Sequence, residues 1–240
     1  MLLSILFITT SIMTYIRDKE LMKGPDVCIL FIKVSLLVGQ TCFIISAFTN
    51  RDNNELLCIM LTFIQHFAWQ FYFILISAFA IHIAKNVDTT APISMDKISK
   101  MMVLVSALIS IATVASAFVY TKFSKQIYLN PNLCWLDNEI ILPYFFMIPL
   151  AISIFVNIIA FSMIVYKVKV TTIQTNDNVQ ASNHANISKV IVRLFLLMGF
   201  TWIFGFLANI NSLQWLWYAF VSCNSLQGVY LYLSFGFRKC

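Results

Sequence analysis

Seven long apolar segments dominate the pattern of hydrophobic and polar positions along the chain. Each approaches the roughly 20 residues that a helix needs to cross a bilayer, and polar residues collect in the connections between them. Strands of alternating polarity, which are typical of membrane β-barrels, do not occur. The pattern therefore predicts an all-α integral membrane protein, a single seven-transmembrane helix bundle with spans at about 1–16, 26–48, 56–84, 98–120, 140–166, 190–209 and 215–237.

The composition indicates a lipid environment. Of the 240 residues, 60% are hydrophobic and 11% are charged. A soluble domain of this size exposes most of its residues to water, so it cannot hide this much apolar surface. In a bilayer, lipid solvates the outer faces of the helices, and membrane lipid is therefore an expected partner.

The basic residues predict the orientation of the bundle. The connections on one side of the membrane carry twelve Lys and Arg residues, and those on the other side carry three. Basic connections stay in the cytoplasm, which places the N-terminus outside and the C-terminus inside. The net charge of +6 has the same origin, and no basic and aromatic stripe indicates a nucleic-acid partner. Lys33 lies inside the second span, and we expect its long side chain to reach the headgroups rather than to take a polar-core role.

The residues offer little catalytic chemistry. The three histidines lack metal-binding spacing, and no nucleophile triad, phosphate loop or carboxylate pair can be assembled. We therefore predict no enzyme, no metal and no cofactor. The spans hold no acidic residue at mid-depth, which disfavours a pump or proton-coupled transporter. His66 lies about 12 Å from Cys58 along the third span, where it faces lipid, a neighbouring helix or a ligand pocket.

Three short motifs resemble the family-2 G-protein-coupled receptors, and most closely their adhesion branch. Residues 199–205 in the sixth span, GFTWIFG, are similar to that branch's G-x-T-W-x-F-G segment, and residues 224–228 in the seventh, NSLQG, match its N-S-L-Q-G segment. Cys134 and Trp135 in the second outer loop resemble the family's C-W pair. The third span departs from the family, with Leu75 and Phe79 where Trp and Glu are usual.

The resemblance implies a set of roles for individual residues. It implies a disulfide between Cys58 and Cys134, which both face an oxidising space and would otherwise be free thiols. It implies agonist contacts at Trp135 and Trp202, and at Phe206 one turn from Trp202. His66 is a candidate ligand contact from its position in the third span, and a hydrogen-bonded structural role is the favoured alternative. A bend is expected at Gly199 and Gly205, and switch or packing roles at Asn224, Gln227 and Gly228. The residues expected to face a heterotrimeric G protein are His82, Lys85, Lys167, Lys189 and Arg193.

The function implied is that of a plasma-membrane receptor. An extracellular or tethered peptide agonist would bias the sixth helix and so signal to the G protein. Three alternatives stay open: static packing at the motifs, a truncated non-signalling receptor that pairs with full-length partners, and a seven-span transporter or channel.

The first span is short, about 24 Å against a hydrocarbon core of about 30 Å. No extracellular domain precedes it in the sequence. We expect a fragment or a receptor that has lost its ectodomain. The alternative is a cleaved signal peptide, but the segment has neither a basic n-region nor a small-residue cleavage site.

Overall fold

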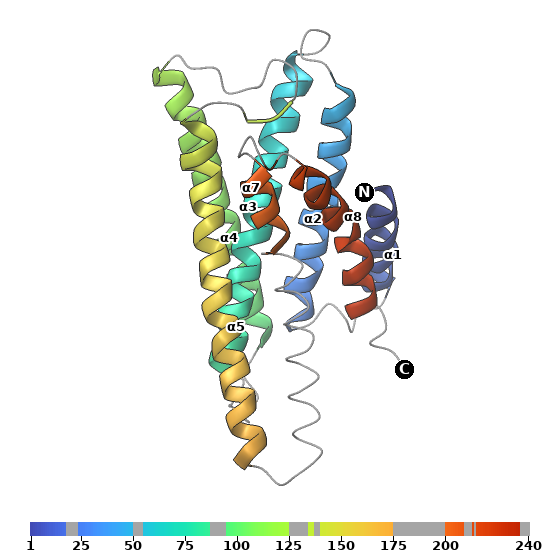
Figure 1. Ribbon diagram of the computed structural model, residues 1–240, viewed down its shortest axis with the longest axis vertical. Coiled ribbons are helices and arrows are strands. Elements are labelled where there is room, and N and C mark those ends of the chain that lie inside the picture. Colours follow the sequence, from blue (N-terminus) through green and yellow to red (C-terminus); the bar gives the residue numbers. More distant parts are fainter. Residues whose placement is uncertain are drawn as a thin grey trace. The chain divides into compact units, whose positions relative to one another are not determined.

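The structure, a computed structural model, describes residues 1–17, 24–49, 55–86, 95–124, 134–136, 140–174, 200–208, 213 and 215–235. The elements that these residues form are helices (Figure 1). In chain order they are α1 (Leu2–Arg17), α2 (Asp26–Phe48), α3 (Glu55–Asn86), α4 (Met95–Ser124), the π-helix η2 (Leu142–Met147), α5 (Ile148–Gln174), α7 (Phe200–Ala208) and α8 (Leu216–Phe235).

The helices follow the predicted spans closely. Four of those described are long and apolar enough to cross a membrane, namely Asp26–Phe48, Glu55–Asn86, Asp96–Phe123 and Leu142–Lys167. Helix α1 is also apolar but shorter, and only the last part of the sixth predicted span lies within the described residues. The all-helical prediction is therefore confirmed, whereas the count of seven crossings and the orientation stay predictions.

The chain divides into two compact units. The first unit comprises Met1–Thr14, Ile76–Ser94 and Ile154–Cys240, and the second comprises Tyr15–Leu75 and Met95–Ser153. Helices α3 and α5 each contribute one part to either unit. The two units are described separately below.

In the second unit, α2 packs on α3 through a glycine and a tryptophan. A Cβ added at Gly39 would lie 3.1 Å from Trp69 Cε2, so the bare backbone is what admits the indole ring. Trp69 in turn meets Tyr72 edge-on, with ring centroids 5.9 Å apart. A second pair joins the same helices nearby, since Phe31 and Phe71 form an edge-on contact at 6.4 Å. Aromatic contact around one close approach therefore holds α2 to α3.

Helix α4, also part of the second unit, buries a stripe of small residues. The buried positions Ser99, Ser106, Ser110, Ala117 and Thr121 are spaced alternately seven and four residues apart, so they line one helical face. Small side chains let helix backbones approach each other in a membrane. The approach is close enough for Cys28 Sγ of α2 to reach Ser99 O, 3.6 Å away. The opposite face of α4 exposes large apolar residues, as a lipid-facing helix does.

The expectation that Lys33 reaches the headgroups is wrong. Its side chain is 0% exposed, and its ammonium lies 4.1 Å from the centre of the Tyr15 ring, which is itself buried. A cation over an aromatic face is stabilised by the ring's electron density, and more so away from water. Lys33 therefore takes the polar-core role, and it joins the end of α1 to α2 within the second unit.

In the first unit, α1 docks on α8 by a close backbone approach (Figure 1). The Gly228 amide donates to Ser4 Oγ over 2.9 Å. A Cβ added at Gly228 would overlap the hydroxyl and the backbone oxygen of Ser4 and would lie 2.6 Å from Ile8 Cγ1. Phe7 and Tyr232 extend the contact, with ring centroids 5.1 Å apart. Gly228 is therefore required for space, at a point where two helices almost touch.

We predict that Gly228→Ala lowers the melting temperature of the purified protein by about 5 °C, because an overpacked contact costs about 1–3 kcal/mol. Thermal unfolding followed by thiol-reactive dye fluorescence measures the shift. Gly39→Ala is the matched control. Its melting temperature should fall less, because the added methyl meets a tryptophan ring rather than a backbone oxygen. A Gly228→Ala protein as stable as the parent would contradict the α1–α8 contact.

Candidate functional site

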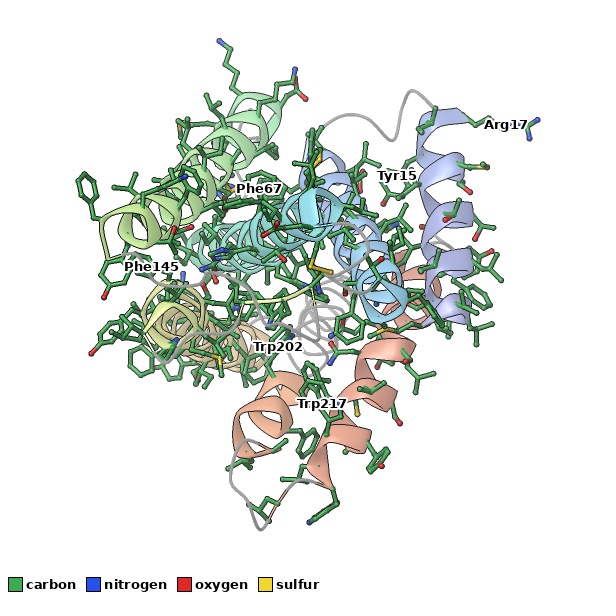
Figure 2. The ribbon with its side chains drawn as sticks, turned by 90° about the horizontal axis from the view of Figure 1, so that it is seen from above. Tyr15, Arg17, Phe67, Phe145, Trp202 and Trp217 are labelled. Carbon is green, nitrogen blue, oxygen red and sulfur yellow. A yellow bond between two sulfur atoms is a disulfide. The ribbon has the colours of Figure 1, made fainter. Side chains whose placement is uncertain are left out.

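The motif residues of the sixth and seventh spans gather around Phe220 in the first unit. Trp202 of α7 meets the Phe220 ring edge-on at 5.0 Å between centroids, and Trp217 of α8 stacks on it at 5.2 Å (Figure 2). Trp202 and Phe220 are buried, whereas Trp217 is exposed. Phe220 was not among the predicted site residues. It belongs to no motif, and its position between two tryptophans follows only from the pairing of the helices.

Gly205 makes room for the same ring. A Cβ at this position would lie 3.1 Å from both Cδ2 and Cε2 of Phe220. Gly205 sits inside α7, where glycine costs about 1 kcal/mol relative to alanine. The close approach of Phe220 gives the physical reason for that glycine. Gly199, the other predicted bend residue, lies outside the described residues, as does the side chain of Phe206.

A polar contact joins the two motifs directly. The Gln227 side-chain amide donates to Thr201 Oγ1 over 3.4 Å, and both residues are buried. Asn224, also buried, donates from Nδ2 to Phe220 O over 2.8 Å, one turn back on α8. The motif residues Thr201 and Gln227 therefore form a bridge between α7 and α8. It lies next to Gly228, where α8 meets α1.

In the second unit, a disulfide fixes the short segment 134–136 to the start of α3. Cys58 and Cys134 are bonded, which confirms the predicted pair, and both are fully buried. The next residue, Trp135, is half-buried and meets Phe146 of η2 edge-on at 5.3 Å. Phe146 also meets His66 edge-on at 5.8 Å. Three aromatic rings therefore run from the disulfide-linked segment through η2 to α3.

His66 faces a neighbouring segment rather than lipid. Its Nε2 lies 3.2 Å from Phe145 O, and because a carbonyl only accepts, the ring donates from Nε2. Gln70, one turn further along α3, donates to the same oxygen over 2.9 Å. Gln70 was not among the predicted site residues, although its spacing from His66 places both side chains on one face of the helix.

The opposite end of α3 carries two of the predicted G-protein-facing residues. There Ala84 packs in a small buried cluster with Ala160 and Ile164 of α5. This contact in the first unit brings the helix ends that carry Lys85 and Lys167 to the same end of the α3–α5 pair. His82 is tied to Asn86, which donates from Nδ2 to His82 O over 2.8 Å. Lys189 and Arg193 lie outside the described residues.

Most of the sequence matches one receptor family. The family model described as 7 transmembrane receptor (Secretin family) aligns with residues 1–231. The chain belongs to this secretin family of seven-transmembrane receptors. This confirms the family predicted from the motifs and identifies a multi-pass protein of the plasma membrane.

The similar curated proteins place this secretin-family receptor with the adhesion branch. Human adhesion G protein-coupled receptor F4 is 28% identical over 95% of this chain and 33% of its own length. Mouse adhesion G protein-coupled receptor E5 is 24% identical over 97% of this chain and 28% of its own length. Human adhesion G protein-coupled receptor L4 is 32% identical over 44% of this chain and 16% of its own length. The chain thus spans a third or less of each of these relatives.

We predict that Cys58→Ser and Cys134→Ser lower the melting temperature equally, and that the double variant loses no more than either single one. Each change removes the same bond, and loss of a native disulfide costs about 2–5 kcal/mol. Thermal unfolding of the three proteins checks this. Cys42→Ser, which changes a buried free cysteine of α2, is the control. Additive losses from the two serine variants would contradict a shared bond.

We also predict that Thr201→Val and Gln227→Leu are coupled. Hydrogen bonds between membrane helices contribute about 0.6 kcal/mol on average in double-mutant cycles, so the double variant should be more stable than the two single losses predict by about that amount. Chemical or thermal unfolding gives the coupling energy. Thr201→Val combined with Ser225→Ala is the matched control, because Ser225 Oγ bonds within its own helix to Val221 O. Full additivity of Thr201→Val and Gln227→Leu would exclude the bridge.

Proposed function

We propose that the chain is the membrane-spanning signalling part of an adhesion-type receptor. In this proposal it is a bundle of seven helices with its N-terminus outside and its C-terminus in the cytoplasm. An extracellular or tethered peptide agonist acts on it, and a heterotrimeric G protein receives the signal. The family match and the names of the relatives support this assignment, and so does the basic charge on one side of the predicted topology.

The observation that carries the proposal is the packing around Phe220. Both family motifs of the sixth and seventh spans supply residues to it, through Trp202, Gly205 and the bridge from Thr201 to Gln227. An edge-on aromatic pair contributes about 0.5–1.5 kcal/mol beyond its buried area. Contacts of this size are large enough to favour one position of α7 and small enough for a ligand to overcome.

The proposed mechanism is a shift between two positions of the sixth helix. An agonist that binds more tightly when α7 is in one of the two positions increases the population of that position. The size of the shift is set by the difference between its affinities for the two positions. Movement of α7 would break the Trp202–Phe220 contact and the 3.4 Å bridge from Gln227. The contact of Gly228 with Ser4 would stay, because α1 and α8 do not need to move. Gly199 and Gly205 are the proposed places where the sixth helix bends.

Agonist and G-protein contacts are proposed residue by residue from the family motifs. Trp202 and Phe206 in the first unit and Trp135 in the second are proposed agonist contacts, with His66 acting through its neighbours. Proposed contacts with the G protein are His82, Lys85, Lys167, Lys189 and Arg193. Lys85 is exposed, so its charge is available to a partner protein.

We predict that Trp202→Ala abolishes G-protein activation while the protein still reaches the cell surface. The change removes the proposed agonist contact at Trp202, so the agonist can no longer shift α7, but it leaves the disulfide and the α1–α8 contact in place. Nucleotide exchange on each main class of heterotrimeric G protein measures activation by the chain in lipid nanodiscs. It is measured with and without an agonist peptide, synthesised to copy the segment before the first helix in the adhesion-type relatives. Antibody staining of intact cells measures surface expression.

Trp217→Ala is the matched control for this experiment. Trp217 stacks on the same Phe220 ring but is exposed and lies on α8, so its loss should leave most of the exchange activity. If the parent chain drives exchange and Trp202→Ala drives it equally well, the switch role of Trp202 is wrong. If the folded parent chain drives none with any G protein, with or without the agonist peptide, the signalling proposal is wrong.

A further inference from the structure

The segment η2, directly before α5, has an unusual backbone that its sequence explains. Residues 142–147 form a π-helix, in which the Ile148 amide donates to Pro143 O, five residues back. In an α-helix, Phe145 O would accept from the amide four residues later, but that residue is Pro149, which has no N–H. The proline ring would also collide with this carbonyl. A wider turn relieves the collision, and the Phe145 carbonyl is left without the amide that would serve it in an α-helix.

Helix α3 supplies donors to this carbonyl. His66 and Gln70 approach Phe145 O to 3.2 and 2.9 Å, and both side chains are 0% exposed. Inside a membrane a backbone carbonyl without a partner costs several kcal/mol. We refer to His66, Gln70 and the Phe145 carbonyl as the clasp. It holds η2 against α3 at the carbonyl that Pro149 leaves without its usual donor.

The clasp also fixes the neighbouring ring. Phe146 follows Phe145 directly and is almost fully buried between His66 and Trp135. Changing a π-turn into an α-turn removes one residue from the turn, which rotates the preceding segment by about 100° relative to the rest of the helix. Phe146 would then leave its place under Trp135. The register of this one turn therefore decides where Trp135 rests.

We propose that His66 and Gln70 are positioning residues for agonist recognition: by clasping the Phe145 carbonyl they keep the π-turn and hold Phe146 under Trp135. The inference rests on the proposed receptor function for its consequence, because Trp135 is a proposed agonist contact. The placement of Trp135 itself does not depend on that function. The alternative is that the clasp only attaches α5 to α3.

The test compares Gln70→Leu, Pro149→Ala and the double variant. Pro149→Ala gives position 149 an amide that can serve Phe145 O in an α-turn, so the carbonyl no longer needs Gln70. We expect Gln70→Leu to lower the melting temperature by about 4 °C. In the Pro149→Ala background the same change should shift it by less than about 1 °C.

The second readout follows Trp135 directly. The chain contains five tryptophans, so labelling with 5-fluorotryptophan gives a small ¹⁹F spectrum, and Trp135→Phe assigns the signal of Trp135. We expect this signal to move in Gln70→Leu, in Pro149→Ala and in the double variant. The double variant would then regain its stability without regaining the position of Trp135. If the clasp only attaches the helices, the stability and the Trp135 signal of the double variant should return together to those of the parent.

Gln65→Leu is the matched control. Gln65 is a buried glutamine on α3 whose Oε1 has no hydrogen-bond partner among the residues that the structure describes. Its replacement should leave both readouts unchanged. The proposal is overturned if Gln70→Leu keeps the parent's melting temperature, or if the Trp135 signal of Pro149→Ala coincides with that of the parent. If Gln70→Leu does not fold, the Trp135 signal of Pro149→Ala alone decides the test.

Nucleotide exchange by the same proteins separates the two proposals. A parent that stays inactive with and without the agonist peptide, and whose variants still show the expected melting and ¹⁹F changes, would refute the receptor function and keep the clasp. An active parent with an unmoved Trp135 signal in Pro149→Ala would refute the clasp and keep the receptor function. With both correct, Pro149→Ala should reduce the exchange that the agonist peptide drives, although it is at least as stable as the parent.

Discussion

The structure depends on the rule that backbone hydrogen-bonding groups inside a membrane must find partners within the protein. Helices satisfy this rule along most of their length, and the exceptions show where side chains take over. At Phe145 the partner amide is missing because residue 149 is proline, and His66 and Gln70 donate instead. At Gly228 the backbone amide reaches across to a hydroxyl of α1. The buried side chains of Ser4, His66 and Gln70 therefore act as partners for backbone groups.

The same reasoning gives the family motifs a physical content. Gly205 and Gly228 are sites where a Cβ would meet a ring or a neighbouring backbone, and Thr201 and Gln227 are the two ends of one hydrogen bond. These residues come from separate stretches of sequence but form one continuous contact, from α7 through α8 to α1. The motif residues therefore make the contacts that hold three helices of the first unit together.

Much of this organisation was predictable from the sequence. The second span was placed at 26–48, where α2 lies, and the Cys58–Cys134 pair was expected. Hydropathy locates helices because it depends on local composition. It does not tell which helices are neighbours, and for that reason Phe220, Ser4 and Gln70 were not singled out. The error at Lys33 has the same origin, since the Tyr15 ring that covers its ammonium comes from another helix.

The contacts around α8 differ in how readily they can be broken, and this difference bears on a switch. The Gly228–Ser4 approach is a contact between backbones, with no space for adjustment. The neighbouring Gln227–Thr201 bond, at 3.4 Å, is long for a hydrogen bond and joins two side chains. A free-energy difference of about 1.4 kcal/mol shifts a two-state equilibrium tenfold. In the proposed mechanism, an agonist would have to offset the Trp202–Phe220 contact and this hydrogen bond to release α7 from α8, whereas separating α8 from α1 would require the loss of a packed backbone contact. The proposed mechanism therefore takes α7 as the element that moves and the α1–α8 pair as the support against which it moves.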